Sequence, residues 1–362
     1  MKKIFLVLML MAASKLFAQD STKTIVVANP LTFSGYVEAY YQYDFNKPTD
    51  NNRPGFIYSH NRHNEFNINL GFLKAAYSHD RVRANLAVGV GTYMNANYSA
   101  EPATLKNIYE ANAGIKISKK KNLWIDAGIF SSHIGFESAV SKDCWTLTRS
   151  MLADNSPYFE SGAKLTYTSD NNKWVLSALA LNGWQRIKRV EGNSLMSYGT
   201  QVQYKPNATT TFNYSTFIGT DKPDSTRQWR YFHNFYGIFN ITKKLGVTAG
   251  FDIGTEQQSK GSSEMNTWYS PVLILKYALN NKWAVAARGE YYNDKYGVII
   301  ASGTPNGFQT SGFSFNIDYA PVSNAVIRVE ARTFNSKDAV FPKYNGISKN
   351  NNFITSSIAI SF

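Results

Sequence analysis

Residues 324–334, with the sequence NAVIRVEARTF, alternate between apolar and charged side chains. The apolar positions are Ala325, Ile327, Val329 and Ala331. The charged positions between them are Arg328, Glu330 and Arg332. Successive side chains of a β-strand point to opposite faces, so this alternation predicts a strand with one apolar face and one charged face.

The same alternation returns along almost the whole chain, whereas the spacing typical of amphipathic helices is nearly absent. It predicts sixteen strand segments: 33–45, 64–79, 81–98, 107–118, 122–130, 158–169, 172–186, 196–206, 209–219, 230–242, 244–256, 267–279, 281–294, 308–321, 324–335 and 352–362. We therefore expect an all-β protein.

The connections between these segments alternate in length. Short turns fall around residues 80, 119–121, 170–171, 207–208, 243, 280 and 322–323. Longer connections cover 46–63, 99–106, 131–157, 187–195, 220–229, 257–266, 295–307 and 336–351. Barrels of outer membranes have short periplasmic turns and long extracellular loops. The pattern therefore predicts a transmembrane antiparallel up-and-down β-barrel of about 16 strands.

The composition excludes several other classes of protein. Only 17% of the 362 residues are charged and 15% are aromatic, so the chain can bury enough apolar surface to fold. Past residue 18, no apolar run reaches the ~18–20 residues of a membrane-spanning helix. The single cysteine excludes a disulfide scaffold and a cysteine-based zinc site. A secreted array of β-sandwich domains is the alternative fold, although no Pro/Ser-rich linker divides the chain.

The N-terminus has the pattern of a secretory signal peptide over residues 1–18. Lys2 and Lys3 precede the apolar stretch 4–13, which is too short to span a membrane, and cleavage is expected after Ala18. We expect residues 19–32 to be a short periplasmic lead-in and residues 33–362 to be a single barrel domain. The expected location is the outer membrane of a Gram-negative-type cell envelope, reached after the signal peptide is cleaved.

The charged face of the strands would line the interior of such a barrel, because the apolar face would meet lipid. A barrel of 16 strands is wide enough for an aqueous channel. The best candidates for pore-lining residues are Arg81, Arg83, Glu110, Lys116, Arg288, Glu290, Arg328, Glu330 and Arg332. Charged rings set the ion preference of pores, so the arginines predict a weak preference for anions, which pairing with the glutamates would reduce.

The longest connection, 131–157, is the candidate for a constriction of the channel. A loop of this length in a compact fold is usually functional or mobile. Its charged candidates are Glu137, Lys142, Asp143, Arg149 and Asp154. We expect the loop to fold into the lumen. A loop that stays on the outer surface is the alternative, since a sequence does not reveal the direction of a loop.

No catalytic or metal-binding pattern is present in the sequence. His60 and His63 form the only close histidine pair, and they lack a third ligand at a typical spacing. The chain has no G-x-S-x-G, phosphate-loop or H-E-x-x-H motif. We therefore predict no enzymatic activity, no cofactor and no metal. The net charge of +13 is spread along the chain, with several lysines at the short turns near lipid phosphates, and it predicts no nucleic-acid partner.

Three segments of the chain are FSGYVEAYY (33–41), TRS (148–150) in the long loop, and PYFESGAKL (157–165) after it. In these segments the chain resembles the OmpL-like β-barrel outer-membrane porins. The final IAISF (358–362) is similar to the C-terminal strand signal that outer-membrane insertion machinery recognises. The resemblance implies a water-filled channel for passive diffusion of small hydrophilic solutes or ions, outer-membrane lipid as a partner, and a trimer such as porins commonly form. The alternative function is a barrel whose extracellular loops bind a partner or surface ligand, with little or no conductance.

Overall fold

The computed structural model describes residues 29–362. The predicted signal peptide and most of the predicted lead-in lie outside the described residues. Residues Leu31–Phe362 form one compact unit. Its first strand begins at Leu31, slightly before the predicted start of the barrel domain at residue 33.

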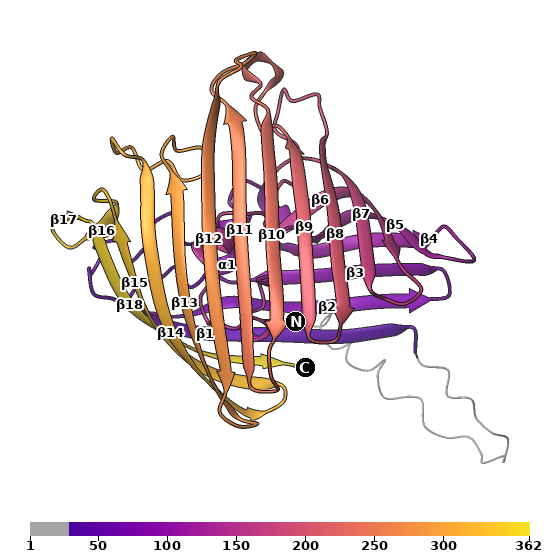
Figure 1. The fold of residues 1–362 in the computed structure, drawn as a ribbon, viewed down its shortest axis with the longest axis horizontal. Coiled ribbons are helices and arrows are strands. Elements are labelled where there is room, and N and C mark those ends of the chain that lie inside the picture. Colours follow the sequence, from indigo (N-terminus) through magenta and orange to yellow (C-terminus); the bar gives the residue numbers. More distant parts are fainter. Residues whose placement is uncertain (1–28) are drawn as a thin grey trace, which may run out of the picture. The chain divides into compact units, whose positions relative to one another are not determined.

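Sixteen antiparallel strands close into a barrel in which neighbours in the sequence pair with each other and the first strand pairs with the last (Figure 1). They are β1 Leu31–Asp44, β2 Phe66–His79, β3 Val82–Val90, β4 Ile108–Lys116, β5 Asn122–Ser131, β6 Phe159–Thr168, β7 Trp174–Leu181, β8 Ser197–Asn207, β9 Thr210–Gly219, β10 Arg230–Asn240, β11 Leu245–Gln257, β12 Met265–Ala278, β13 Trp283–Asp294, β14 Phe308–Val322, β15 Ala325–Ser336 and β18 Asn350–Ser361. The predicted up-and-down barrel is confirmed, and each predicted segment corresponds to one of these strands.

Short additional elements lie in the long connections. They are the two-stranded sheet of β16 (Phe341–Lys343) and β17 (Gly346–Ser348), the helices α1 (Thr92–Asn97) and α2 (Met151–Asp154), and the 3-10 helices η1 (Ala103–Asn107), η2 (Ser141–Asp143) and η3 (Asp224–Thr226). The long connections are therefore partly ordered by structure of their own.

The predicted strand 81–98 is too long. β3 ends at Val90, and Gly91 adopts a φ of +121°, a conformation that favours glycine. A Cβ atom at this position would lie 2.5 Å from the carbonyl oxygen of Asn69. The chain leaves the sheet at this glycine and forms α1 instead.

The two faces of the strands differ in the sense predicted for a membrane barrel. On β15, Ile327 and Val329 are 43% and 45% exposed, whereas Arg328 and Glu330 are 1% and 0% exposed. A soluble antiparallel sheet has a buried apolar face and a wet polar face. The reversed arrangement argues against the β-sandwich alternative and leaves the apolar face for lipid. No helix within residues 29–362 is long and apolar enough to cross a membrane.

A β-bulge in β2 turns the polar residues of this strand inward. The register between β1 and β2 shifts next to Glu38, where Asn69 is the extra residue. The Asn69 side chain accepts a hydrogen bond from the backbone N–H of His60 and donates one to Glu38, which fixes the bulge at this position. After it, Leu73 is 67% exposed and Lys74 faces the lumen.

Replacing Val329 by lysine is expected to destabilise the barrel by about 2–4 kcal/mol, because the new charge would face lipid near the middle of β15. Thr166→Lys in β6 is the matched control, since Thr166 is half-buried on the lumen face and its replacement should cost much less. The measurement is reversible urea unfolding in the presence of lipid vesicles. Equal losses of stability in the two variants would contradict this assignment of faces.

Candidate functional site

The connection between β5 and β6, residues 132–158 and hereafter the β5–β6 loop, crosses the lumen and contacts strands on the far side of the barrel. The backbone N–H of Leu147 donates to Asn316 Oδ1 on β14 (3.0 Å). The N–H of Met151 donates to Glu290 Oε2 on β13 (2.6 Å). The loop therefore folds into the lumen, and the alternative of an outer surface loop is wrong.

Two arginines of the opposite wall bind both lumen carboxylates and the backbone of this loop. Arg288 lies 2.8 Å from Glu330 and 3.3 Å from Glu290, and it donates to the carbonyl oxygen of Thr148 at 2.7 Å. Arg332 lies 2.5 Å from Glu290 and donates to the Arg149 carbonyl at 2.8 Å. These side chains connect β13 and β15 to the middle of the loop.

A third arginine, Arg328 on β15, binds an earlier part of the loop. Its guanidinium pairs with Asp318 at 2.7 Å and donates to the carbonyl oxygens of Ser141 (2.6 Å) and Cys144 (3.0 Å). The Ser141 hydroxyl also hydrogen-bonds Glu38 on β1. The loop is thus attached to the wall on both sides of the junction where the barrel closes.

Burial makes this network important for stability. Arg288, Arg328 and Arg332 are 2%, 1% and 4% exposed. A buried carboxylate that loses its cationic partner typically costs 3–5 kcal/mol, so removing one arginine would penalise the whole network. The structure places these predicted pore-lining residues against the β5–β6 loop. Whether they also line the conducting path stays a prediction.

Two of the predicted constriction residues hold the loop together internally. Arg149 is fully buried and donates to the carbonyl oxygens of Ser138 (2.6 Å) and Leu147 (2.8 Å). Glu137 accepts a hydrogen bond from the backbone N–H of Ser150 (3.0 Å), at the start of α2. The Arg149 side chain is therefore directed into the loop, whereas Glu137 also lies 3.9 Å from Arg288 on β13.

The other three predicted constriction residues have different surroundings. Lys142 is half-buried and Asp143 is exposed, and both lie in η2. Asp154 is only 5% exposed, at the end of α2. The five residues therefore do not form one cluster.

His133 anchors the start of the loop. Its Nδ1 lies 2.9 Å from Glu160 on β6, and its Nε2 lies 2.9 Å from the carbonyl oxygen of Thr216 on β9. Burial acts to lower the pKa of His133, but the Glu160 carboxylate and these hydrogen bonds raise it above its ordinary value. In the protonated ring both nitrogens are donors, which satisfies both oxygen partners.

The remaining predicted pore-lining residues lie on a wetter wall. Arg83 pairs with Asp126 at 2.6 Å while its side chain stays 34% exposed. Glu110 accepts from Lys74, and Arg81 donates to the Lys116 carbonyl at 2.6 Å. Arg81, Glu110 and Lys116 are also half-buried. These residues lie on the inner face of strands β2 to β6, hereafter the β2–β6 wall. They retain contact with water, unlike the arginines of β13 and β15.

The sequence analysis missed the contribution of the first long connection. Arg53 pairs with Asp44 at 3.2 Å, and His60 lies 3.1 Å from Glu38. His63 accepts a hydrogen bond from the backbone N–H of Asp44, so His60 and His63 contact different residues. Glu38 and Asp44 on the inward face of β1 are carboxylates that need partners when they are buried. This pair is the sequence signal that could have revealed the role of the first long connection. No group of three metal-binding side chains occurs in the described part of the chain.

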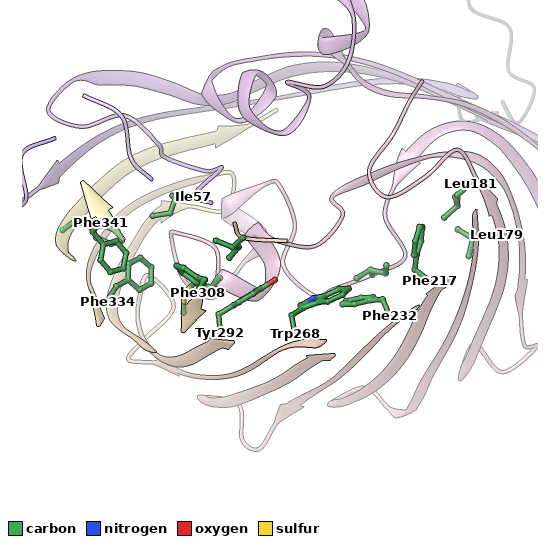
Figure 2. Close-up of a cluster of buried hydrophobic side chains, with 14 of the residues drawn as sticks. Ile57, Leu179, Leu181, Phe217, Phe232, Trp268, Tyr292, Phe308, Phe334 and Phe341 are labelled. Atoms are coloured by element: carbon green, nitrogen blue, oxygen red, sulfur yellow. The ribbon is translucent and has the colours of Figure 1, made fainter. Parts of the chain in front are cut away.

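Aromatic side chains line the inner face near the ends of the strands that carry long connections (Figure 2). The labelled aromatic members are Phe217, Phe232, Trp268, Tyr292, Phe308, Phe334 and Phe341. Ile57 of the first long connection and Met151 of the β5–β6 loop belong to the same buried cluster. This packing supports the folded-in loops at the mouth of the barrel.

Residues 30–362 match the family described as "Putative beta-barrel porin-2, OmpL-like". The chain belongs to this porin family. The resemblance found in the sequence is therefore confirmed over nearly the whole chain. No curated protein matches the chain.

Solved structures resemble this porin in fold. The anion-selective porin from Comamonas acidovorans has a TM-score of 0.61 at 8% identity, with 92% of this chain and 99% of that chain covered. In-vitro folded OmpT of Vibrio cholerae has a TM-score of 0.58 at 12% identity, and DcaP of Acinetobacter baumannii a TM-score of 0.58 at 11% identity, with 92% and 97% of the chains covered in both cases. Identities this low establish the fold alone.

Arg328→Ala is expected to loosen the β5–β6 loop of the porin, because Asp318 and three loop carbonyls lose their shared donor. Cys144 is the single cysteine of the chain and is 5% exposed, so it reports on this loop. Maleimide labelling of Cys144 in the folded protein should be slow in the wild type and at least about tenfold faster in the variant, for a loss of roughly 1.4 kcal/mol.

Arg83→Ala is the control for this labelling experiment, since Arg83 faces the lumen but pairs with Asp126 on β5. It should leave the labelling of Cys144 slow. Equal labelling rates in the wild type and in Arg328→Ala would show that Arg328 does not hold the loop in place.

Proposed function

We propose that this protein is an outer-membrane porin whose channel passes between the β5–β6 loop and the β2–β6 wall. The observation that carries the proposal is the position of the loop, which is hydrogen-bonded to β13, β14 and β15 on the opposite side of the lumen. This position supports a path along the β2–β6 wall, where charged side chains stay in contact with water. Solutes would cross by passive diffusion.

The side chains of this wall favour small hydrophilic solutes and ions. Asn85 and Asn112 hydrogen-bond to each other at 3.0 Å between the ion pairs of Lys74 and Arg83. A lining of amides and charges keeps water in place, and an apolar solute would have to displace that water without replacing its hydrogen bonds. The inward-folded β5–β6 loop would limit the size of what passes.

Purified folded protein in a planar lipid bilayer is expected to give stable ohmic conductance steps. Arg328→Ala should raise the step size, because it loosens the loop that narrows the channel. Heat-modifiable migration on gels verifies that both proteins are folded barrels. A folded barrel without conductance would contradict the porin proposal and favour the alternative, a barrel whose extracellular loops bind a partner.

The charge of the β2–β6 wall supports a weak preference for anions. Its inward-facing basic residues are Lys74, Arg81, Arg83, Lys116 and Lys164. The acidic partners are Glu110, which pairs with Lys74, and Asp126, which pairs with Arg83. Glu160 on β6 is buried against His133. More basic than acidic groups therefore face the path, and such an excess attracts anions.

In a potassium chloride gradient, the sign of the reversal potential should indicate preference for chloride. The double variant Arg81→Gln, Lys116→Gln removes two basic groups of this wall and should move the reversal potential towards zero. Lys121→Gln is the control, because Lys121 lies at a short turn and pairs with Asp170. A double variant with the reversal potential of the wild type would contradict the proposed path.

We also propose how the chain is exported and how it assembles in the outer membrane. Residues 1–18 would serve as a cleaved signal peptide, and outer-membrane lipid would surround the apolar face. OmpT of Vibrio cholerae, a protein of similar fold, is described in a trimer form. A homotrimer is the corresponding proposal for this porin.

A further inference from the structure

A cavity of about 330 Å³ lies at the mouth of the barrel formed by the long connections. Its walls come from six connections, and its lining includes Asp154 and Ser156 at the end of α2. Its volume is within the range of small-molecule sites, and its lining is mainly polar with a smaller apolar part.

Two hydrogen-bond acceptors in this cavity lack adequate donors. Asp154 is 5% exposed, and its carboxylate receives only a long hydrogen bond of 3.4 Å from Ser59. Asn97 at the end of α1 is 6% exposed, and its Oδ1 has no hydrogen-bond partner among residues 29–362. Buried polar atoms in native proteins are nearly always satisfied by protein groups, water or a ligand, so these two oxygens can accept hydrogen bonds from a bound molecule.

The charge of Asp154 points to a cationic donor. Within the described chain, no basic group forms an ion pair with Asp154. Burial raises the pKa of this carboxyl to about 7, although the charges of Arg332, Arg149 and Arg288 act to lower it. A bound ammonium group would replace the lost hydration and stabilise the ionised carboxylate.

Two basic residues from other connections lie on the same cavity. Lys222 is half-buried, and its ammonium group makes no ion pair or hydrogen bond with the described residues. Arg186 is 3.7 Å from Asp221, which is a loose pair, and its side chain is 28% exposed. The cavity therefore offers anion-binding groups in addition to the buried carboxylate.

An apolar part of the lining completes the site. Val298 and Ile299 contribute aliphatic surface, and Trp184 contributes its ring. The Trp184 ring packs edge-on against Phe217 (5.0 Å) and Phe232 (4.8 Å) of the aromatic cluster in Figure 2, so its position is fixed by the barrel wall. A ligand body with some apolar surface would be held against a rigid side of the cavity.

We propose that this cavity binds small zwitterionic solutes of the amino acid or short-peptide class before they enter the channel. The ammonium group would bind Asp154 and Asn97, and the carboxylate would bind Lys222 and Arg186. A purely anionic solute would be repelled by Asp154, a purely cationic one by Lys222 and Arg186, and a neutral sugar would leave both kinds of charge unpaired. The assignment rests on the proposed porin function, whose substrate class it names.

The probe is the dipeptide leucyl-glycine, which has both charges and an apolar side chain. Binding is measured at about pH 7.5, where most of the Asp154 carboxyls are ionised and most of the dipeptide amines are protonated, by block of the single-channel current. Isothermal calorimetry on the detergent-solubilised barrel measures the same binding without any need for conductance. N-acetylated and C-amidated forms of the dipeptide lack one charge each and should bind at least about tenfold more weakly.

Asp154→Asn and Lys222→Gln should each weaken binding of the dipeptide at least about tenfold. Glu191→Gln and Lys188→Gln are the matched controls, because these residues lie in the connection between β7 and β8 outside the cavity lining. They should bind the dipeptide as the wild type does. Heat-modifiable migration verifies folding of all four variants.

Three results would overturn the proposal. They are no binding of the dipeptide at millimolar concentration by either method, equal binding of the acetylated or amidated form, and equal weakening in the control variants. Calorimetric binding with this specificity in a barrel that does not conduct would leave the binding site in place and reject the porin function. The two hypotheses can therefore fail separately.

Discussion

The ion pairs between the arginines of β13 and β15 and the lumen carboxylates are the interaction on which the rest of the structure depends. Charges inside a protein are costly unless they are paired and fully hydrogen-bonded. Arg288, Arg328 and Arg332 come closer to this condition because each donates to carbonyl oxygens of the β5–β6 loop in addition to pairing with carboxylates. The loop is therefore part of the charge compensation of the wall, and its inward fold contributes to the stability of the barrel.

The pairing of the β5–β6 loop with β13, β14 and β15 gives the lumen two sides that differ in their access to water. On β13, β14 and β15 the polar residues are nearly inaccessible to water because loop backbone covers them. On the β2–β6 wall, pairs such as Arg83–Asp126 keep partial contact with water. This division supports the proposed channel along the β2–β6 wall, because the charged groups there remain in contact with water.

The long connections at the mouth of the barrel also pack against the strands, but not all of their polar groups are paired. The aromatic cluster of Figure 2 packs the long connections against the strand ends and makes a firm support. Around the cavity above α2, the polar groups are not all matched, as Asp154 and Asn97 show. Unmatched buried groups on a rigid support are typical of binding sites, because the ligand supplies the missing partners.

The sequence by itself determined the strands, their number and their two faces, because alternation with a period of two is a local property of each segment. It therefore placed Arg328 and Glu330 inside and Val329 outside before any contact was known. It did not determine the bulge at Asn69 or the partners across the lumen, such as Thr148 and Glu330, which lie far apart along the chain. Those depend on which carboxylates remain unpaired once the barrel has closed, and on which loop backbone can reach them. Only the tertiary structure decided this, because long-range charge compensation is a property of the closed barrel and of no single strand.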